Sequence, residues 1–289
     1  MPKTLSSTEL ILDSEGRIYH LHLKPENLAD TIILVGDPSR VTEISQCFDG
    51  IEFRTQEREF VTVTGYIGTK KLSVISTGIS TANVDIVLNE LDALVNIDFK
   101  TRQVKTEHTA LTLIRLGTSG SLQEDIPSDS FLVSSHGVSL NSLFAFYDTK
   151  GLQDEILLNA FIEQTSFEKK GLQAHLFEAD KKLLSVFSKK AKQGITVTCS
   201  GFYGPQERYL RTKNIYPRLI EELNEFQFEG KKITNFEIET AALYGLGKIL
   251  GHHCISISAI VGNRINHQFS SNPKATIDKL IRYVLEIIT

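Results

Sequence analysis

The sequence predicts an α/β protein whose central mixed β-sheet is flanked by helices. Short β-rich runs recur along the chain, and most of them are nearly continuous in apolar or β-branched residues, as strands covered on both faces are. Several of these runs end in glycine and lead into a helical pattern. A chain of 289 residues, 41% of them hydrophobic, can bury a large core, so we expect one domain over residues 1–289.

Seven segments have the composition of buried strands. They are TIILVGD (31–37), FVTVTGYI (60–67), KLSVISTG (71–78), LTLIRLGTSG (111–120), SFLVSSHG (130–137), ITVTCSG (195–201) and CISISAIVG (254–262). Ligands of α/β sheets gather at the carboxyl ends of strands. The glycine-rich ends of these runs are therefore the first places to look for a site.

Apolar residues at helical spacing predict helices between and after the strands. Residues 79–95 follow this pattern, and within 235–250 a helical pattern begins just after Glu237 and Glu239. A stripe from Ile277 to Ile288 predicts a last helix that starts after Asn272 and Pro273. Residues 96–110 are polar and mixed in charge, so we expect an exposed insertion there.

The bulk composition favours a small-molecule ligand. A net charge of -4 and a pI of about 6.1 argue against nucleic acid or an anionic membrane as the main partner. No apolar run approaches the roughly 18 residues that span a bilayer, and residues 1–10 lack the apolar core of a signal peptide. Three widely spaced cysteines fit a reducing compartment. We expect a cytoplasmic protein.

Two strand ends have the residues of an anion site. Gly36 and Arg40 follow the first run, while Arg115 lies inside an apolar run that continues into Gly117 and Thr118. Glycine lets backbone N–H groups approach an anion, and the arginine fork matches phosphate oxygens. These residues indicate a phosphate-sized site, with the alternative that Arg115 pairs with a structural carboxylate such as Asp37.

Nucleotide, metal and hydrolase motifs are missing from the sequence. It has no G-x-x-x-x-G-K-[ST] loop, no G-x-G-x-x-G opening a helix and no G-x-S-x-G elbow. His252 and His253 lack Cys or carboxylate neighbours at zinc spacing. We therefore expect no metal and no cofactor, with any phosphate bound as the free ion.

Two further stretches suggest recognition of a polar small molecule. In SGFYGPQERYL (200–210), Gln206 and Arg208 could grip a planar heterocycle with alternating carbonyl and N–H groups, or form an ordinary surface loop. In NFEIETA (235–241), Glu237 and Glu239 could hold a vicinal diol such as that of ribose, or serve as helix N-terminal acids.

Seven motifs together resemble the nucleoside phosphorylase family. VGDPSRV, REF (58–60), STGIS, IRLGTSG, FYGPQERY, NFEIETA and IVGNR occur in the family's order, and the Gln-x-Arg element is similar to that of the uridine phosphorylase branch. The similarity runs from about Tyr19 to the last strand. It implies a nucleoside phosphorylase-like fold.

The resemblance also implies roles for individual residues. Phosphate would be bound by Gly36, Arg40, Arg115 and Thr118, with Arg58 supplied by the neighbouring subunit. Ribose would be bound by Glu237, Ile238 and Glu239, with His20 reaching the 5′-hydroxyl across a dimer. The base would contact Phe202, Gln206, Arg208 and Arg264. The catalytic set would be Arg115, Thr118, Gln206, Arg208 and Glu239.

The implied reaction is reversible phosphorolysis of uridine to uracil and ribose 1-phosphate, with inorganic phosphate as co-substrate. The implied assembly is at least a homodimer and is expected to be a homohexamer. The alternatives are a purine nucleoside phosphorylase, a nucleoside hydrolase and a non-catalytic nucleoside-binding protein. Purine-specific relatives carry an aspartate after the last strand, and SAIVGNRINH has none.

Three features depart from the family pattern. Ile238 replaces a methionine, Gly204-Pro205 inverts a Pro-Gly pair, and Asn83 replaces a serine that binds potassium in some relatives.

Overall fold

The computed structural model describes residues 3–289, which form two compact units. The first comprises the described residues up to Ile114 together with Leu250–His253 and Thr289, and the second comprises Arg115–Ile249 and Cys254–Ile288. Strands β7 (Thr112–Ser121) and β13 (His253–Asn263) begin in the first unit and continue into the second. The prediction of a single domain over 1–289 stays a prediction.

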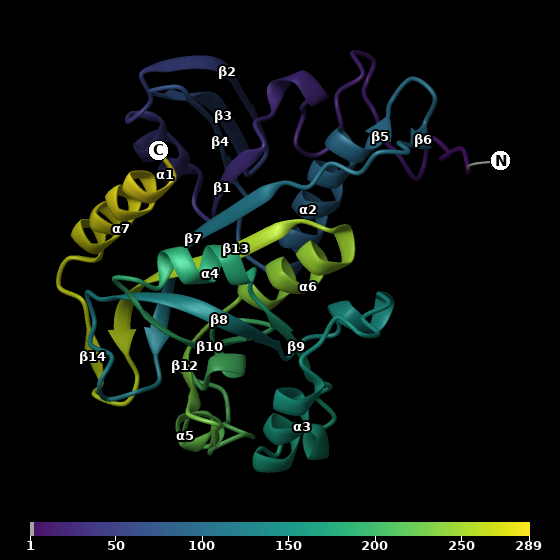
Figure 1. Cartoon of the computed structure of the whole chain (residues 1–289). Coiled ribbons are helices and arrows are strands. Elements are labelled where there is room, and N and C mark those ends of the chain that lie inside the picture. The colour runs from purple at the N-terminus through teal and green to yellow at the C-terminus, as the bar shows by residue number, and fades with distance from the viewer. Residues whose placement is uncertain (1–2) are drawn as a thin grey trace. The chain divides into compact units, whose positions relative to one another are not determined.

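The first unit contains a mixed sheet in which β1 (Thr31–Val35) pairs in parallel with β4 (Lys70–Ser76) (Figure 1). The antiparallel strands β3 (Phe60–Ile67) and β2 (Gly50–Glu57) extend it. All five residues of β1 are buried, as expected for a strand covered on both faces. Helices α1 (Pro38–Ser45) and α2 (Thr81–Asn96) follow β1 and β4 in the chain.

Residues 96–110 belong to the first unit and include a short hairpin. Strands β5 (Ile97–Asp98) and β6 (Gln103–Val104) pair antiparallel, and residues 105–110 are exposed. Lys105 returns to the end of α2 by donating its backbone N–H to the Asn96 carbonyl at 2.8 Å.

The second unit also contains a mixed sheet, with β10 (Lys192–Thr198) parallel to both β8 (Phe131–Ser139) and β12 (Lys231–Glu237). β13 runs antiparallel to β8, and β7 runs antiparallel to β12. Shorter antiparallel partners are β9 (His175–Glu178), β11 (Gln227–Phe228) and β14 (Gln268–Phe269). The predicted α/β class with a mixed sheet is confirmed.

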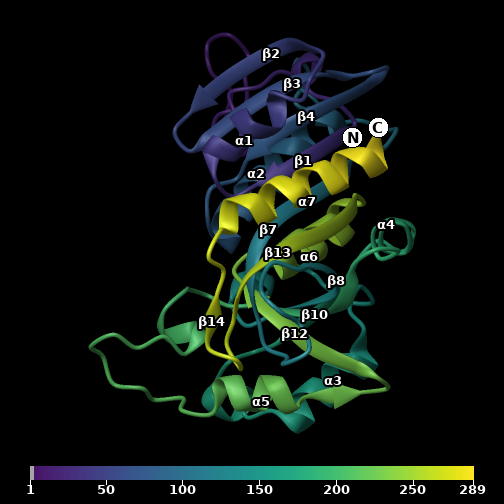
Figure 2. The ribbon, with the colours of Figure 1, turned by 90° about the vertical axis from the view of Figure 1, so that its left-hand side faces the viewer.

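Five α-helices belong to the second unit: α3 (Glu155–Gln164), α4 (Lys181–Phe187), α5 (Leu219–Glu225), α6 (Thr240–Leu250) and α7 (Pro273–Ile288). Figure 2 shows α7 as a long straight helix near the C-terminus, and Tyr283 on it donates to the Phe187 carbonyl at 2.6 Å. Single 3-10 turns occur at Pro25–Asn27, Leu143–Phe146, Glu168–Lys170 and Gly204–Gln206.

Helix α6 lies directly on β8 because Gly137 has no side chain. A Cβ atom at Gly137 would stand 2.8 Å from the Cα of Ala241 in the first turn of α6. This close approach fixes where α6 begins, and therefore where the residues just before it lie. Those residues include Glu237 and Glu239, which the sequence analysis marked for a binding role.

All seven predicted strands are strands in the structure, and the three predicted helices are α2, α6 and α7. The sequence did not predict β2, β9 and β12, the two-residue strands β5, β6, β11 and β14, or the helices α1, α3, α4 and α5. β12 begins with two lysines and carries Thr234 and Asn235 in its buried part, so its composition does not resemble that of a buried strand. Within residues 3–289, none of the helices is long and apolar enough to cross a bilayer.

Candidate functional site

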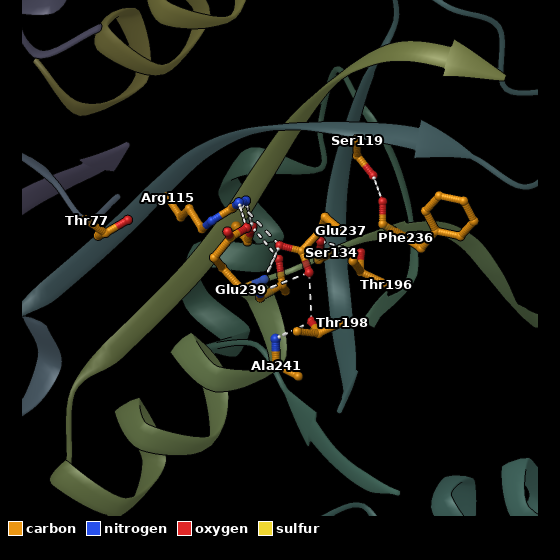
Figure 3. A network of polar contacts seen from close by, with 12 residues as sticks. Thr77, Arg115, Ser119, Ser134, Thr196, Thr198, Phe236, Glu237, Glu239 and Ala241 are labelled. Atoms are coloured by element: carbon orange, nitrogen blue, oxygen red, sulfur yellow. Dashed lines mark hydrogen bonds and ion pairs between the residues drawn. The ribbon is translucent and has the colours of Figure 1, made fainter. Parts of the chain in front are cut away.

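Arg115 is a buried cation held between two buried carboxylates. Its Nη2 atom lies 3.3 Å from Glu237 Oε2 and forms a closer ion pair with Glu239 (Figure 3). Nη1 reaches Ser256 Oγ at 3.4 Å. Burial disfavours the charged guanidinium, but the two carboxylates outweigh burial and leave the pKa of Arg115 raised. The three side chains therefore form one charged cluster inside the second unit.

Glu237 also fixes the start of α6. Its carboxylate accepts the backbone N–H groups of Glu239 at 2.8 Å and Thr240 at 2.9 Å, and the hydroxyl of Thr198 at 2.7 Å. Thr198 in turn accepts the N–H of Ala241 at 2.8 Å. Glu237 thus satisfies backbone N–H groups at the start of α6, and its expected ribose contact stays a prediction.

Gly117 leaves the space that the Arg115 side chain occupies. The two residues are on the same face of β7, and a Cβ atom at Gly117 would lie 2.1 Å from Arg115 Nη1. Thr118 is half-buried and belongs to the opposite face in a regular strand. The expected phosphate contact of Thr118 stays a prediction.

The loop after β10 brings Gln206 and Arg208 together. The 3-10 turn Gly204–Gln206 is followed by Glu207 in the left-handed region at φ 53°, and this places the Arg208 guanidinium beside the Gln206 amide. Arg208 Nη1 donates to Gln206 Oε1 and to the Phe202 carbonyl at 3.1 Å, and the guanidinium lies 3.9 Å from the centre of the Phe202 ring.

Arg264 holds the backbone of this loop. Its Nη1 and Nη2 atoms donate to the carbonyls of Gln206 at 2.9 Å and Glu207 at 3.1 Å. Burial, with Arg264 as a second cause, lowers the pKa of Arg208 to about 10. The observed contacts of Arg264 are those of a positioning residue, while its expected base contact stays a prediction.

An apolar cavity of about 690 Å³ borders the same loop. Its walls include Leu140, Phe167 and Tyr216 on one part and the backbone turn Gly204-Pro205 on another. The turn is therefore not fully packed on the side that faces the cavity. The two hydrogen bonds from Arg264 hold the loop to the end of β13.

In the first unit, Gly36 and Arg40 surround the start of α1. Gly36 follows β1, Asp37 caps the helix by accepting the Ser39 N–H at 2.9 Å, and Arg40 lies in the first turn. A Cβ atom at Gly36 would lie 3.4 Å from the Gly78 carbonyl at the end of the parallel strand β4. The phosphate contacts expected for Gly36 and Arg40 stay predictions.

His20 and Arg58 also belong to the first unit, where both contact Tyr19. The His20 ring lies 4.8 Å from the Tyr19 ring in an edge-on arrangement, and the Arg58 guanidinium lies 5.5 Å from the same ring. Arg58 is exposed and has a positive φ of 53°, a backbone strain that is common at functional positions. The two residues expected to act on a neighbouring subunit are thus grouped on one surface.

Asn83, at the position of the potassium-binding serine of some relatives, contacts a carboxylate. Its Nδ2 atom donates to Glu59 Oε1 at 3.1 Å.

One cluster with metal-ligating atoms was not foreseen from the sequence. Asp92, His108 and His252 each place a ligand atom within 4.8 Å of the others. His252 Nδ1 accepts the Leu111 N–H at 3.2 Å, so neutral His252 carries its proton on Nε2, 3.4 Å from Asp92 Oδ1. A histidine that binds a metal through Nε2 needs this proton on Nδ1 instead. The expectation of no metal stays a prediction.

Small polar residues that were not predicted from the sequence support the charged cluster. Thr198 and Ser256 contact Glu237 and Arg115, and Ser119 ties β7 to β12 by donating to the Phe236 carbonyl at 2.8 Å. Each is a small polar residue inside a buried strand. That placement is the signal that could have marked them.

The chain is similar to known proteins over nearly its whole length. The family model described as "Phosphorylase superfamily" matches residues 30–287. A uridine phosphorylase of Thermococcus kodakarensis is 28% identical, covering 93% of this chain and 86% of that protein, and one of Haemophilus influenzae is 26% identical, covering 93% and 96%. A Trypanosoma brucei nucleoside phosphorylase, described as showing uridine phosphorylase activity, has a TM-score of 0.86 at 29% identity, covering 96% and 99%.

We expect Arg115→Met to lower the free energy of unfolding by about 3–5 kcal/mol at pH 7.5, because two buried carboxylates lose their cation. Two like charges then remain side by side in the buried cluster. Urea denaturation of variant and parent at pH 7.5 measures the difference.

The exposed Arg211 supplies the control, since Arg211→Met should change the stability by less than about 0.5 kcal/mol. A loss for Arg115→Met no larger than that of the control would contradict the ion-pair account.

Proposed function

Because this chain belongs to the phosphorylase superfamily, we propose that it catalyses the reversible phosphorolysis of uridine to uracil and ribose 1-phosphate. The fold alone does not select the base, so the proposal depends on the side chains that the fold positions. The chain is an enzyme of the pentosyltransferase type and is similar to uridine phosphorylases.

The observation that carries the proposal is the contact between Gln206 and Arg208. It sets a carbonyl acceptor, Gln206 Oε1, directly beside the guanidinium donors of Arg208. The uracil edge presents the complementary pair, an N3–H donor beside a carbonyl acceptor. Cytosine presents an N3 lone pair and an amino donor instead, which would face an acceptor and a donor of the wrong kind.

The proposed reaction transfers the sugar from nitrogen to oxygen. A phosphate oxygen supplies the electron pair of the new bond to C1′, while the bond between C1′ and the base N1 breaks and its electrons stay with the base. Uracil leaves as an anion, which Arg208 and Gln206 stabilise by hydrogen bonds without transferring a proton. Fixed donors aimed at developing charge are the most effective means of lowering such a barrier.

Arg115 and Glu239 have complementary roles in this proposal. Glu239 accepts hydrogen bonds from ribose hydroxyls, and Arg115, the cation beside it, binds phosphate. Glu237 keeps both in place because it contacts Arg115 and the backbone N–H of Glu239. Holding nucleophile and sugar on one rigid cluster supplies the positioning that a reaction between two bound substrates requires.

A second copy of the chain is the proposed source of two further contacts. His20 and Arg58 both contact Tyr19 on one surface of the first unit, and family resemblance assigns them to the neighbouring subunit's ribose and phosphate. We infer that a homodimer is the smallest active assembly and that it forms part of a homohexamer.

We expect uridine to be cleaved at least 100-fold more efficiently than cytidine or inosine, because a mismatched base edge leaves buried polar groups unpaired. The measurement is kcat/KM for each nucleoside, followed by ultraviolet absorbance with and without phosphate. Cleavage of uridine without phosphate would indicate a hydrolase instead. Comparable rates for inosine would indicate a purine enzyme, and binding without turnover a nucleoside-binding protein.

We expect Arg208→Lys to lose about 2–4 kcal/mol of transition-state stabilisation, nearly as much as Arg208→Ala, because lysine keeps the charge but lacks oriented donors. Steady-state kinetics at varied uridine and phosphate concentrations measure this loss. The matched control is Arg211→Lys on the same loop, which should keep parental rates. Near-parental turnover of Arg208→Lys would show that charge alone is sufficient.

A further inference from the structure

We propose that Glu90 is a positioning residue that fixes the proton of His20, so that Nε2 of this histidine accepts a hydrogen bond from the 5′-hydroxyl of the nucleoside. This inference rests on the proposed function. It adds a residue of α2 that contacts neither phosphate nor base and that acts only through His20.

The Glu90 carboxylate gathers several donors from the segment around His20. Its Oε1 lies 2.6 Å from His20 Nδ1 and accepts the backbone N–H of His20 at 3.1 Å, while Oε2 accepts the N–H of Leu21 at 2.8 Å. The Glu90 side chain is only 13% exposed, which strengthens these bonds relative to a surface pair. Both the ring and the backbone of His20 are thus fixed by one carboxylate.

This contact determines which ring nitrogen carries the proton. An ionised carboxylate only accepts hydrogen bonds, so His20 Nδ1 must be the donor in the 2.6 Å contact. In neutral His20 the other nitrogen, Nε2, is then an acceptor. A sugar hydroxyl can donate to it. Without Glu90, the neutral ring could carry its proton on either nitrogen. In the tautomer with the proton on Nε2, this atom could no longer accept a hydrogen bond from the hydroxyl.

Two aromatic rings restrict the direction of the imidazole. Tyr19 lies edge-on to it at 4.8 Å and Phe60 edge-on at 6.2 Å between ring centres. Phe60 is buried, whereas Tyr19 is exposed on the surface shared with Arg58. With its Nδ1 edge bound to Glu90 and two rings packed edge-on against it, the His20 ring has a defined orientation.

The test compares uridine with 5′-deoxyuridine, which lacks the hydroxyl that His20 would bind. The variant is Glu90→Gln, whose amide oxygen accepts hydrogen bonds but whose NH₂ group only donates, so that it cannot accept from both Nδ1 and the Leu21 N–H. We expect kcat/KM for uridine to fall about tenfold through KM, with less than a twofold change for 5′-deoxyuridine. In a His20→Phe background, Glu90→Gln should cause no further loss.

Asp92→Asn is the matched control, because it removes a neighbouring carboxylate of α2 that does not contact His20. It should leave the ratio of the two kcat/KM values unchanged. Equal losses of Glu90→Gln on both substrates, or a further loss in the His20→Phe background, would overturn the inference and assign Glu90 a purely structural role. No loss on uridine would also overturn it.

Glu90→Asp is the second variant if Glu90→Gln does not fold, as judged by thermal denaturation. It keeps the charge but withdraws the carboxylate by one methylene, and the same selective loss on uridine is expected. Failure of the proposed function is distinct from these outcomes, because the parent protein itself would then not cleave uridine in the presence of phosphate.

Discussion

The ion pairs of Arg115 with Glu237 and Glu239 are the interaction on which the second unit depends. An arginine buried in a strand is tolerated only with partners of opposite charge, and here the partners come from the end of β12 and the approach to α6. The cluster therefore locks β7, β12 and the start of α6 together. Removing Arg115 would leave two buried carboxylates without their cation.

The same cluster can bind polar ligands because its charges do not cancel. Two carboxylates and one guanidinium leave one negative charge, which suits hydrogen-bond donors such as sugar hydroxyls, while the cation remains beside it for an anion. The loop that carries Gln206 and Arg208 is held differently, because it borders a cavity and its backbone accepts two hydrogen bonds from Arg264.

Local sequence patterns predicted most of the long strands but few of the contacts between side chains that are distant in the sequence. Continuous apolar runs identified seven strands because burial on both faces requires them. β12 escaped because its buried Thr234 and Asn235 are satisfied by polar contacts that only the folded sheet provides. The sequence offered Asp37 as an example of a carboxylate partner for Arg115, but the observed partner Glu239 is 124 residues away and no local signal joins the two. The contact of His20 with Glu90 spans 70 residues and escaped for the same reason.

The central claim is that Arg115 is shared between the sugar-binding carboxylate and phosphate. Calorimetric titration of Glu239→Gln with inorganic phosphate tests it most directly, alongside the turnover of uridine. Neutralising Glu239 removes a negative charge beside the phosphate-binding cation, so the account predicts phosphate binding about tenfold tighter while turnover falls at least 100-fold. Unchanged or weaker phosphate binding in Glu239→Gln would contradict the claim, because Arg115 would then not be the cation that the two groups share.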